Sequence, residues 1–234
     1  MCGRFTLRSP TAVLARRLRA EVKIKRNPRF NIAPTQSVLV ILANDANQKE
    51  APAREAKTMN WGLVPSWAKD PSSAARLINC RSETAATKPS FRSAFQSRRC
   101  LVIADGYYEW ERAGKQKLPW HIHRTDEQPF AMAGLWETWQ PDKASSPLLS
   151  CTVLTTNSNK RTAFLHERMP VILSSDDEEV WLDHKLQTHE QLEHLFEPFP
   201  SADIDLRPVS THVNNARHEG DNCLEPRATQ GELF

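Results

Sequence analysis

Residues 100–111, with the sequence CLVIADGYYEWE, give the clearest indication of the fold. The aliphatic run from Cys100 to Ala104 is typical of a buried strand, and Asp105-Gly106 follows it as a turn signal. Aromatic residues then return between Tyr107 and Glu111, in a pattern typical of a second strand. The stretch therefore predicts a β-hairpin in which these two segments pair with each other.

Short elements of the same kind follow one another along the chain. Apolar runs at residues 37–43 and 148–156 predict further strands, and Ser9-Pro10 predicts the start of a helix with the serine as its N-cap. The 234 residues contain no repeat and no low-complexity linker. We therefore expect one α+β domain over residues 1–234, with a β-rich core, short helices and a polar tail from about residue 215.

The overall composition is that of a folded protein, with 39% hydrophobic and 25% charged residues. No apolar run reaches the roughly 18 residues of a membrane span, and no basic segment precedes an apolar one at the N-terminus, so we expect a cytoplasmic protein. The net charge of +3 permits nucleic-acid binding but indicates it only weakly. The five cysteines are scattered and form no CxxC pair, which argues against a disulfide framework or a zinc ribbon.

Cys2 directly follows the initiator methionine, and its small side chain favours removal of Met1 by an aminopeptidase. A chain that begins with cysteine carries an α-amine with a pKa of about 7.7–8.0 and a thiol with a pKa of about 8.5 on adjacent carbons. The amine can attack an aldehyde to give an imine, and the thiol can then close a five-membered thiazolidine. Taken alone, however, Cys2 is more simply explained as an ordinary residue of a frayed terminus.

Three polar residues lie among apolar or aromatic neighbours. Glu109 is flanked by Tyr108 and Trp110, and a carboxylate in such surroundings tends to have a raised pKa, which suits a general acid or base near neutral pH. His166 could shuttle protons, and Asn79 could orient a substrate by hydrogen bonding. The alternatives are a salt-bridged surface strand for the glutamate, a surface histidine and a turn residue.

Basic and aromatic residues near these positions form a pattern typical of proteins that bind single-stranded nucleic acid. Arg4, Arg81 and Arg168 each lie next to a candidate residue. Phe30 and Trp67 stand in irregular loops, where bases or sugars could stack on them. For Trp67, a position in the hydrophobic core is an equally good interpretation.

His121 and His123 alternate along a predicted strand and so invite a metal-binding interpretation. A third ligand at suitable spacing is not evident. We therefore expect both histidines to be exposed strand residues, and we expect the protein to use neither a metal nor a cofactor.

Six short motifs follow one another along the chain. They are CGRF (residues 2–5), RFNIAPT (29–35), WGLVPSW (61–67), NCRSET (79–84), DGYYEW (105–110) and HERMP (166–170). In their order they resemble the SRAP family, named for "SOS-response-associated peptidase", from residue 2 to about residue 215. The resemblance implies two curved β-sheets in a barrel-like core flanked by helices. It also implies a DNA-repair protein that binds single-stranded DNA and forms a covalent thiazolidine between its N-terminal cysteine and the aldehyde of an abasic site.

Carried over position by position, the resemblance assigns roles to individual residues. The nucleophile would be Cys2, with Asn79, Glu109 and His166 at the other catalytic positions. Phosphates would be held by Arg4, Arg81 and Arg168, and the DNA channel would be shaped by Asn31, Pro34 and Trp67. Cys80 departs from the pattern, because a small residue is common there in the family. It adds a second thiol beside Asn79.

The imine that the resemblance implies would also permit β-elimination of the 3′ phosphate, as in an abasic-site lyase, and the crosslink could be reversed by the same residues. Two other functions stay open. One is a cysteine peptidase that removes only its own leader, with Cys2 as nucleophile and His166 or the α-amine as base. The other is a single-strand-binding module without catalysis. We expect a monomer that makes no membrane contact and joins the nucleoid when it binds DNA.

Overall fold

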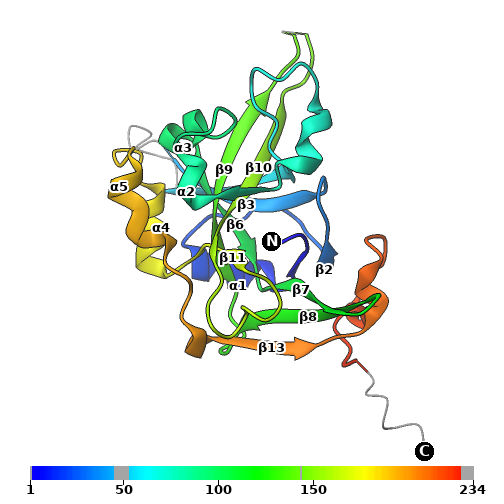
Figure 1. The fold of residues 1–234 in the computed structure, drawn as a ribbon. Helices are drawn as coiled ribbons and strands as arrows, with labels where there is room; N and C mark the ends of the chain where they lie inside the picture. Colours follow the sequence, from blue (N-terminus) through cyan, green and yellow to red (C-terminus); the bar gives the residue numbers. More distant parts are fainter. Residues whose placement is uncertain (1, 45–52, 143, 228–234) are drawn as a thin grey trace, which may run out of the picture.

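The computed structural model describes residues 2–44, 53–142 and 144–227 (Figure 1). The strands are β1 (Phe5–Leu7), β2 (Arg29–Ile32), β3 (Ser37–Ala43), β4 (Arg54–Trp61), β5 (Asn79–Arg81), β6 (Arg99–Ala104), β7 (Gly106–Ala113), β8 (Gln116–Arg124), β9 (Phe130–Trp139), β10 (Leu148–Asn157), β11 (Arg168–Pro170), β12 (Ile172–Leu173) and β13 (Ile204–Pro208). The helices are α1 (Thr11–Leu18), α2 (Ser82–Ala85), α3 (Arg92–Ser97), α4 (Ser175–Leu182) and α5 (His189–Leu192). Short 3-10 turns are η1 (Pro71–Arg76), η2 (Glu193–Phe196), η3 (Ser201–Asp203), η4 (Thr211–Asn214) and η5 (Asp221–Cys223).

Five of the described strands close into a barrel, in the order β10, β4, β3, β6, β9 and back to β10. Neighbouring strands are antiparallel except β10 and β4, which run parallel with Ser150 opposite Asn60. Aliphatic side chains such as Val40, Leu101 and Leu135 are fully buried there. The prediction of an α+β, β-rich fold with a barrel-like core is thus confirmed, and the barrel closes within a single sheet.

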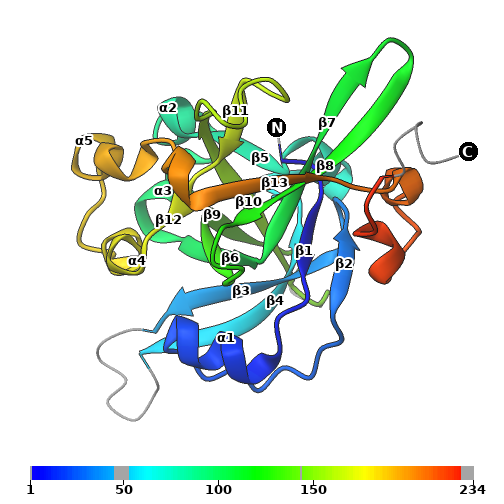
Figure 2. The same ribbon diagram turned by 90° about the horizontal axis from the view of Figure 1, so that it is seen from below.

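A second, antiparallel sheet has the order β13, β8, β7, β1, β2. Its β7–β8 hairpin projects beyond the body of the molecule (Figure 2). The two sheets meet where Phe5 of β1 packs edge-on against Trp61 of β4, with ring centroids 4.9 Å apart. Because β1 begins three residues after Cys2, this contact places the start of the described chain at the junction of the two sheets.

The predicted hairpin over residues 100–111 is wrong. β6 pairs with β3 and β9 in the barrel, whereas β7 pairs with β1 and β8 in the second sheet. The chain crosses between the sheets at Asp105, whose buried carboxylate accepts hydrogen bonds from the backbone N–H groups of Arg8 and Ser9 at 2.5 and 2.8 Å. These bonds from the two residues that follow β1 hold the crossing in place, so Asp105-Gly106 is a corner rather than a hairpin turn.

The same carboxylate changes the start of α1. The hydroxyl of Ser9 donates to Asp105 at 3.1 Å instead of capping the helix, and Pro10 occupies the N-cap position. The predicted serine cap is therefore wrong, although the helix itself is present and buries Leu14 and Leu18.

His121 and His123 are buried, and their rings stack with centroids 5.4 Å apart, so the prediction that they are exposed is wrong. The Nε2 atom of His121 lies 3.2 Å from the hydroxyl of Thr6. The imidazole also covers Gly106, where an added Cβ would lie 2.1 Å from Nε2. Gly106 is therefore required by the close approach of the histidine. Among the described residues, no group of three or more His, Cys, Asp and Glu side chains could hold a metal ion.

The segment after β13 does not leave the body of the protein at residue 215. Cys223 is fully buried, and Val209 forms an antiparallel bridge with Pro226. The predicted polar tail is thus packed on the second sheet as far as the described chain reaches, and residues 228–234 lie outside the described part. In the part of the chain that the structure describes, none of the helices has the length and apolar character needed to cross a membrane.

Candidate active site

The start of the chain is held between the two sheets by Asn79. The side-chain amide of Asn79, at the beginning of β5, donates a hydrogen bond of 2.7 Å to the backbone carbonyl oxygen of Cys2. β5 runs parallel to β10 of the barrel, and Cys2 leads into β1 of the second sheet. The Oδ1 atom of Asn79 is buried and has no hydrogen-bond partner among the described residues. It is therefore available to accept a hydrogen bond from a bound molecule.

Glu109 reaches the same junction from β7. The pairing of β1 with β7, with Phe5 opposite Tyr107, brings the start of the chain alongside this strand. Glu109 is only 6% exposed, so a surface strand does not describe its surroundings. Burial raises the pKa of its carboxyl group. The raised pKa makes this group easier to protonate near neutral pH than an exposed glutamate.

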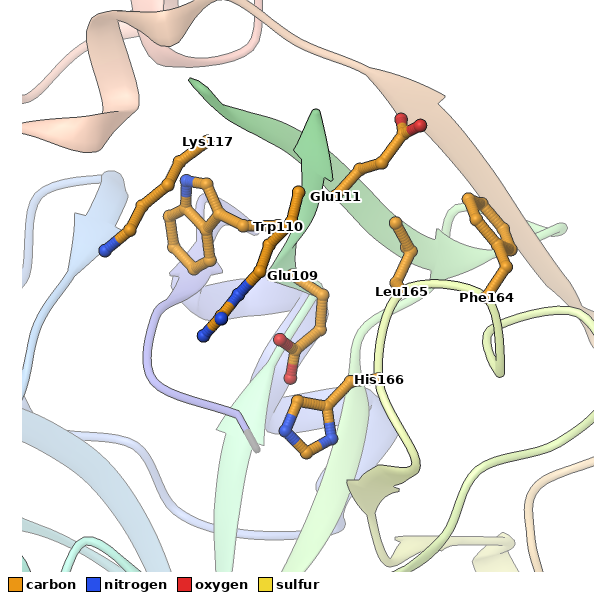
Figure 3. A pocket seen from close by; sticks show the side chains of 8 residues that line it. Glu109, Trp110, Glu111, Lys117, Phe164, Leu165 and His166 are labelled. Atoms are coloured by element: carbon orange, nitrogen blue, oxygen red, sulfur yellow. The ribbon is translucent and has the colours of Figure 1, made fainter. Parts of the chain in front are cut away.

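His166 faces Glu109 across a cavity of about 630 Å³ (Figure 3). Figure 3 shows the carboxylate of Glu109 directed toward the imidazole. The Nδ1 atom of His166 lies 2.9 Å from the backbone N–H of Arg168, from which it accepts a hydrogen bond. Nδ1 therefore carries no proton, and in the neutral ring the proton is on Nε2. Burial lowers the pKa of His166, which favours this neutral form.

The thiol of Cys2 is fully buried, and burial followed by the negative charge of Glu109 raises its pKa to about 12. The carboxylate thus lies near enough to influence the thiol. While Met1 is attached, the nitrogen of Cys2 is an amide and cannot act as an amine. The expected removal of Met1 concerns a residue outside the described part of the chain.

The three arginines expected to hold phosphates differ in exposure. The side chain of Arg81 is 56% exposed, and its Nη2 atom lies 3.9 Å from Oε1 of Glu167. Arg168 is 6% exposed and bound by both carboxylate oxygens of Glu83, at 2.5 and 2.8 Å. Arg4 is half-buried and donates to Asn31. The structure therefore presents Arg81 to the surface and commits the other two to contacts within the protein.

The three residues expected to shape a DNA channel also differ in their exposure to solvent. Asn31 is fully buried, and its side-chain N–H groups donate to the carbonyls of Val213, Asn215 and His218. Pro34 is partly buried. Trp67 is 67% exposed and lines a separate cavity of about 330 Å³, so it is not a core residue. The structure brings Trp67 to the surface but does not bring Asn31 there.

Comparison with known proteins defines the family. A sequence model described as SOS response associated peptidase (SRAP) matches residues 1–216. The chain belongs to the SRAP family. Abasic site processing protein YoqW of Bacillus subtilis is 36% identical over 229 residues, which cover 96% of this chain and 99% of that protein. Abasic site processing protein HMCES of Gallus gallus is 35% identical over 225 residues, which cover 85% of this chain and 66% of that protein.

The SRAP fold is also found among solved structures. A Bacteroides thetaiotaomicron protein superposes with a TM-score of 0.85 at 23% identity, covering 97% of this chain and all of that chain. A second protein, from Bordetella bronchiseptica, gives a TM-score of 0.73 at 22% identity and covers 89% of this chain. At this level of identity, the likeness concerns the fold alone.

Several residues of this SRAP site were not predicted from the sequence. The cavity shared by Glu109 and His166 is also lined by Arg112, Lys117 and Phe164. Phe164 is 60% exposed and packs edge-on against Trp120, with centroids 5.5 Å apart. Its position two residues before the candidate histidine was a signal that the sequence already offered. The two cations were harder to find, because only the register of β7 and β8 brings them together.

Cys80, where this SRAP chain departs from the family pattern, lies next to Asn79 in β5. Successive residues of a strand point to opposite faces, so its thiol is directed away from the side chain of Asn79. It is nearly fully buried, and burial raises its pKa to about 12. The second thiol is therefore a neutral, packed side chain.

Proposed function

We propose that this SRAP protein processes abasic sites in single-stranded DNA, by forming a thiazolidine between its mature N-terminal cysteine and the opened sugar. The observation that carries the proposal is the convergence of the chain start, Asn79, Glu109 and His166 where the two sheets meet. Relatives that match nearly the whole chain carry the name abasic site processing protein, which agrees with this chemistry.

The reaction begins when the α-amine of Cys2 attacks the aldehyde carbon of the ring-opened sugar. The new C–N bond forms from the amine's electron pair, and Glu109 takes up the proton that the nitrogen loses. A buried carboxylate with a raised pKa is suited to accept and return a proton near neutral pH. Attack requires an unprotonated amine, which is available at neutral pH because the reference pKa is about 7.7–8.0.

His166 serves as the proton donor on the opposite side of the cavity. Its Nε2–H supplies a proton to the sugar-ring oxygen during opening and regains one from the anomeric hydroxyl. It then protonates the carbinolamine hydroxyl, which leaves as water, and Nε2 is reprotonated by the proton that Glu109 took from the amine. The hydrogen bond at Nδ1 fixes the tautomer that makes this donation possible. Asn79 holds the carbonyl of Cys2 with its amide N–H, and its Oδ1 accepts a hydrogen bond from a hydroxyl of the opened sugar.

The thiol then completes the ring. Its sulfur attacks the imine carbon, the thiol proton ends on the former imine nitrogen, and the net reaction joins aldehyde and aminothiol with loss of one water. Until this closure the imine also allows β-elimination of the 3′ phosphate, so ring closure competes with strand cleavage. Reversal would use the same donor and acceptor in the opposite order.

A denaturing gel tests the proposal directly. The mature protein is incubated with a single-stranded oligonucleotide that contains one abasic site, then heated in denaturant. We expect an adduct with the wild type and none with Cys2→Ala. Cys80→Ala is the matched control, because it removes a buried thiol from β5 that is directed away from the side chain of Asn79, and it should form the adduct. Peptide cleavage without an adduct would instead favour the peptidase, and salt-sensitive binding without an adduct would favour the binding module.

A further inference from the structure

The β7–β8 hairpin carries two cations that face each other. Arg112 and Lys117 are directly paired in the strand register and both are exposed. Residues opposite each other in an antiparallel pair point to the same face of the sheet, and like charges in this position repel. Among the described residues, no carboxylate lies within ion-pair distance of either side chain. The hairpin thus holds two unneutralised positive charges together, an arrangement that an anion would stabilise.

The nearest acidic residue of the hairpin does not relieve this repulsion. Glu111 alternates with Arg112 and therefore points to the opposite face. There its carboxylate accepts a hydrogen bond of 3.0 Å from the indole N–H of Trp120. Figure 3 shows the side chains of Glu111 and Lys117 on opposite sides of the strand.

The orientation of the cationic face is fixed by η4. Asn214 accepts a hydrogen bond of 2.7 Å from the indole N–H of Trp110 and donates one of 3.1 Å to the carbonyl of Lys117. The preceding residue, Val213, accepts a hydrogen bond of 3.1 Å from Arg4. The guanidinium of Arg4 also lies 5.8 Å from the centre of the Trp110 ring. Arg4 is therefore adjacent to the hairpin face that carries the two cations.

Both cations also line the cavity of the candidate active site, although Arg112 and Glu109 point to opposite faces of β7. Arg112 and Lys117 line the same 630 Å³ cavity as Glu109 and His166. Trp67, the exposed aromatic residue expected to contact DNA, lines a different cavity that shares none of these residues. A DNA strand with one nucleotide at Glu109 and His166 would therefore lie beside the basic surface of the hairpin. The aromatic surface at Trp67 is separate from that basic surface.

We infer that Arg112 and Lys117 form a phosphate-binding site for the DNA strand that flanks the reacting nucleotide. The inference rests on the proposed function, because that function places a DNA strand in this cavity. The ligand is a run of phosphodiesters, which an exposed pair of cations can contact without reading sequence. The hairpin therefore adds affinity that depends on the length of the DNA and on salt.

The test is a binding titration that does not depend on crosslinking. Fluorescence anisotropy is measured between about 50 and 200 mM salt with single strands that carry an unreactive tetrahydrofuran analogue of the abasic site. One strand is long enough to cross the hairpin and a second ends at the analogue. The double variant Arg112→Gln/Lys117→Gln is compared with wild type. The control is Arg16→Gln/Lys25→Gln, which removes the same charge from α1 and the loop after it, away from the hairpin in Figure 2.

For the long strand, we expect the hairpin variant to bind on the order of tenfold more weakly and the slope of log K against log salt to fall by about 1.4, since each phosphate contact with a single strand contributes about 0.7. The difference should shrink for the short strand, and the control should bind like wild type. An unchanged slope in the hairpin variant, or an equal loss in the control, would overturn the inference. Absence of an adduct with reactive DNA would instead refute the proposed function, while the salt slope would still report on the hairpin.

Discussion

The backbone N–H of Arg168 donates a hydrogen bond of 2.9 Å to Nδ1 of His166. This single contact leaves the proton of the neutral imidazole on Nε2. It links a proton donor to the backbone of β11, and β11 is in turn anchored to β10 of the barrel. The position of the donor is therefore set by a strand of the fold as well as by the loop before it.

From this relationship we expect His166→Ala to slow both formation and reversal of the adduct, by about 10²-fold or more, because a positioned general acid contributes on that scale. Rates are measured by quenching and denaturing electrophoresis, with reversal followed after excess unlabelled abasic DNA is added. His194→Ala, which alters an exposed histidine of η2, is the control. Reversal at the wild-type rate in His166→Ala would remove the proton-donor role.

Glu109 leads to a prediction about pH. Burial raises the pKa of its carboxyl, so the ionised form that accepts a proton is lost at a pH above the ordinary value of 4.5. The adduct rate should fall as the pH drops through that raised pKa, in addition to the loss caused by protonation of the amine. Glu109→Gln should react slowly and lack this acidic limb. A variant with the wild-type rate and pH profile would show that the carboxylate takes no part.

Arg168 should be sensitive to a change that keeps its charge. Lysine cannot reproduce the two parallel hydrogen bonds to Glu83, so Arg168→Lys should lower the free energy of unfolding by about 1–3 kcal/mol. It should also slow adduct formation at saturating DNA, because the backbone that orients His166 shifts. Arg81→Lys is the matched comparison: the exposed Arg81 can hold a phosphate as a point charge, and we expect little change. Equal behaviour of the two variants would contradict this division of roles.

The buried His121 leads to a prediction of how the free energy of unfolding changes at acid pH. Burial lowers its pKa well below the usual value, whereas in the unfolded chain it titrates near pH 6.5. Below about pH 6.5 the unfolded state therefore binds more protons. Above that pH the neutral ring makes its full contribution to the free energy of unfolding. As the pH falls below it, this free energy decreases by up to about 1.4 kcal/mol per pH unit.

Urea unfolding at a series of pH values measures this loss. His121→Gln should show a shallower dependence on pH between about pH 6.5 and 5 than the wild type. His194→Gln should follow the wild type, since that side chain is exposed in the structure. Parallel curves for His121→Gln and wild type would contradict the assignment.

The local pattern of apolar and aromatic residues predicted where strands occur, but it did not predict which strands pair with one another. The apolar run before Asp105 and the aromatic run after it are both strands, yet they belong to different sheets. Nothing within residues 100–111 reveals that the carboxylate of Asp105 is satisfied by backbone N–H groups of Arg8 and Ser9. The crossing therefore depends on a contact far away in the sequence, which periodicity does not report.

The candidate site shows the same limit. The aromatic neighbours of Glu109 suggested a carboxylate with a raised pKa and left a surface strand open, and the structure buries this side chain. Asn31 and Arg168 are residue types that suit DNA, but tertiary contacts with carbonyl groups and Glu83 occupy them in the structure. Arg112 and Lys117 were missed because their pairing follows from strand register.

The most direct test of the central claim is the intact mass of the product formed from mature protein and abasic single-stranded DNA. A thiazolidine requires the mass of protein plus DNA minus one water, in an adduct that survives heat without a reducing agent. Cys2→Ser, which keeps the amine but not the thiol, should give an adduct only when borohydride traps the imine. A heat-stable adduct of the same type from Cys2→Ser, or none from the mature wild type, would contradict the account.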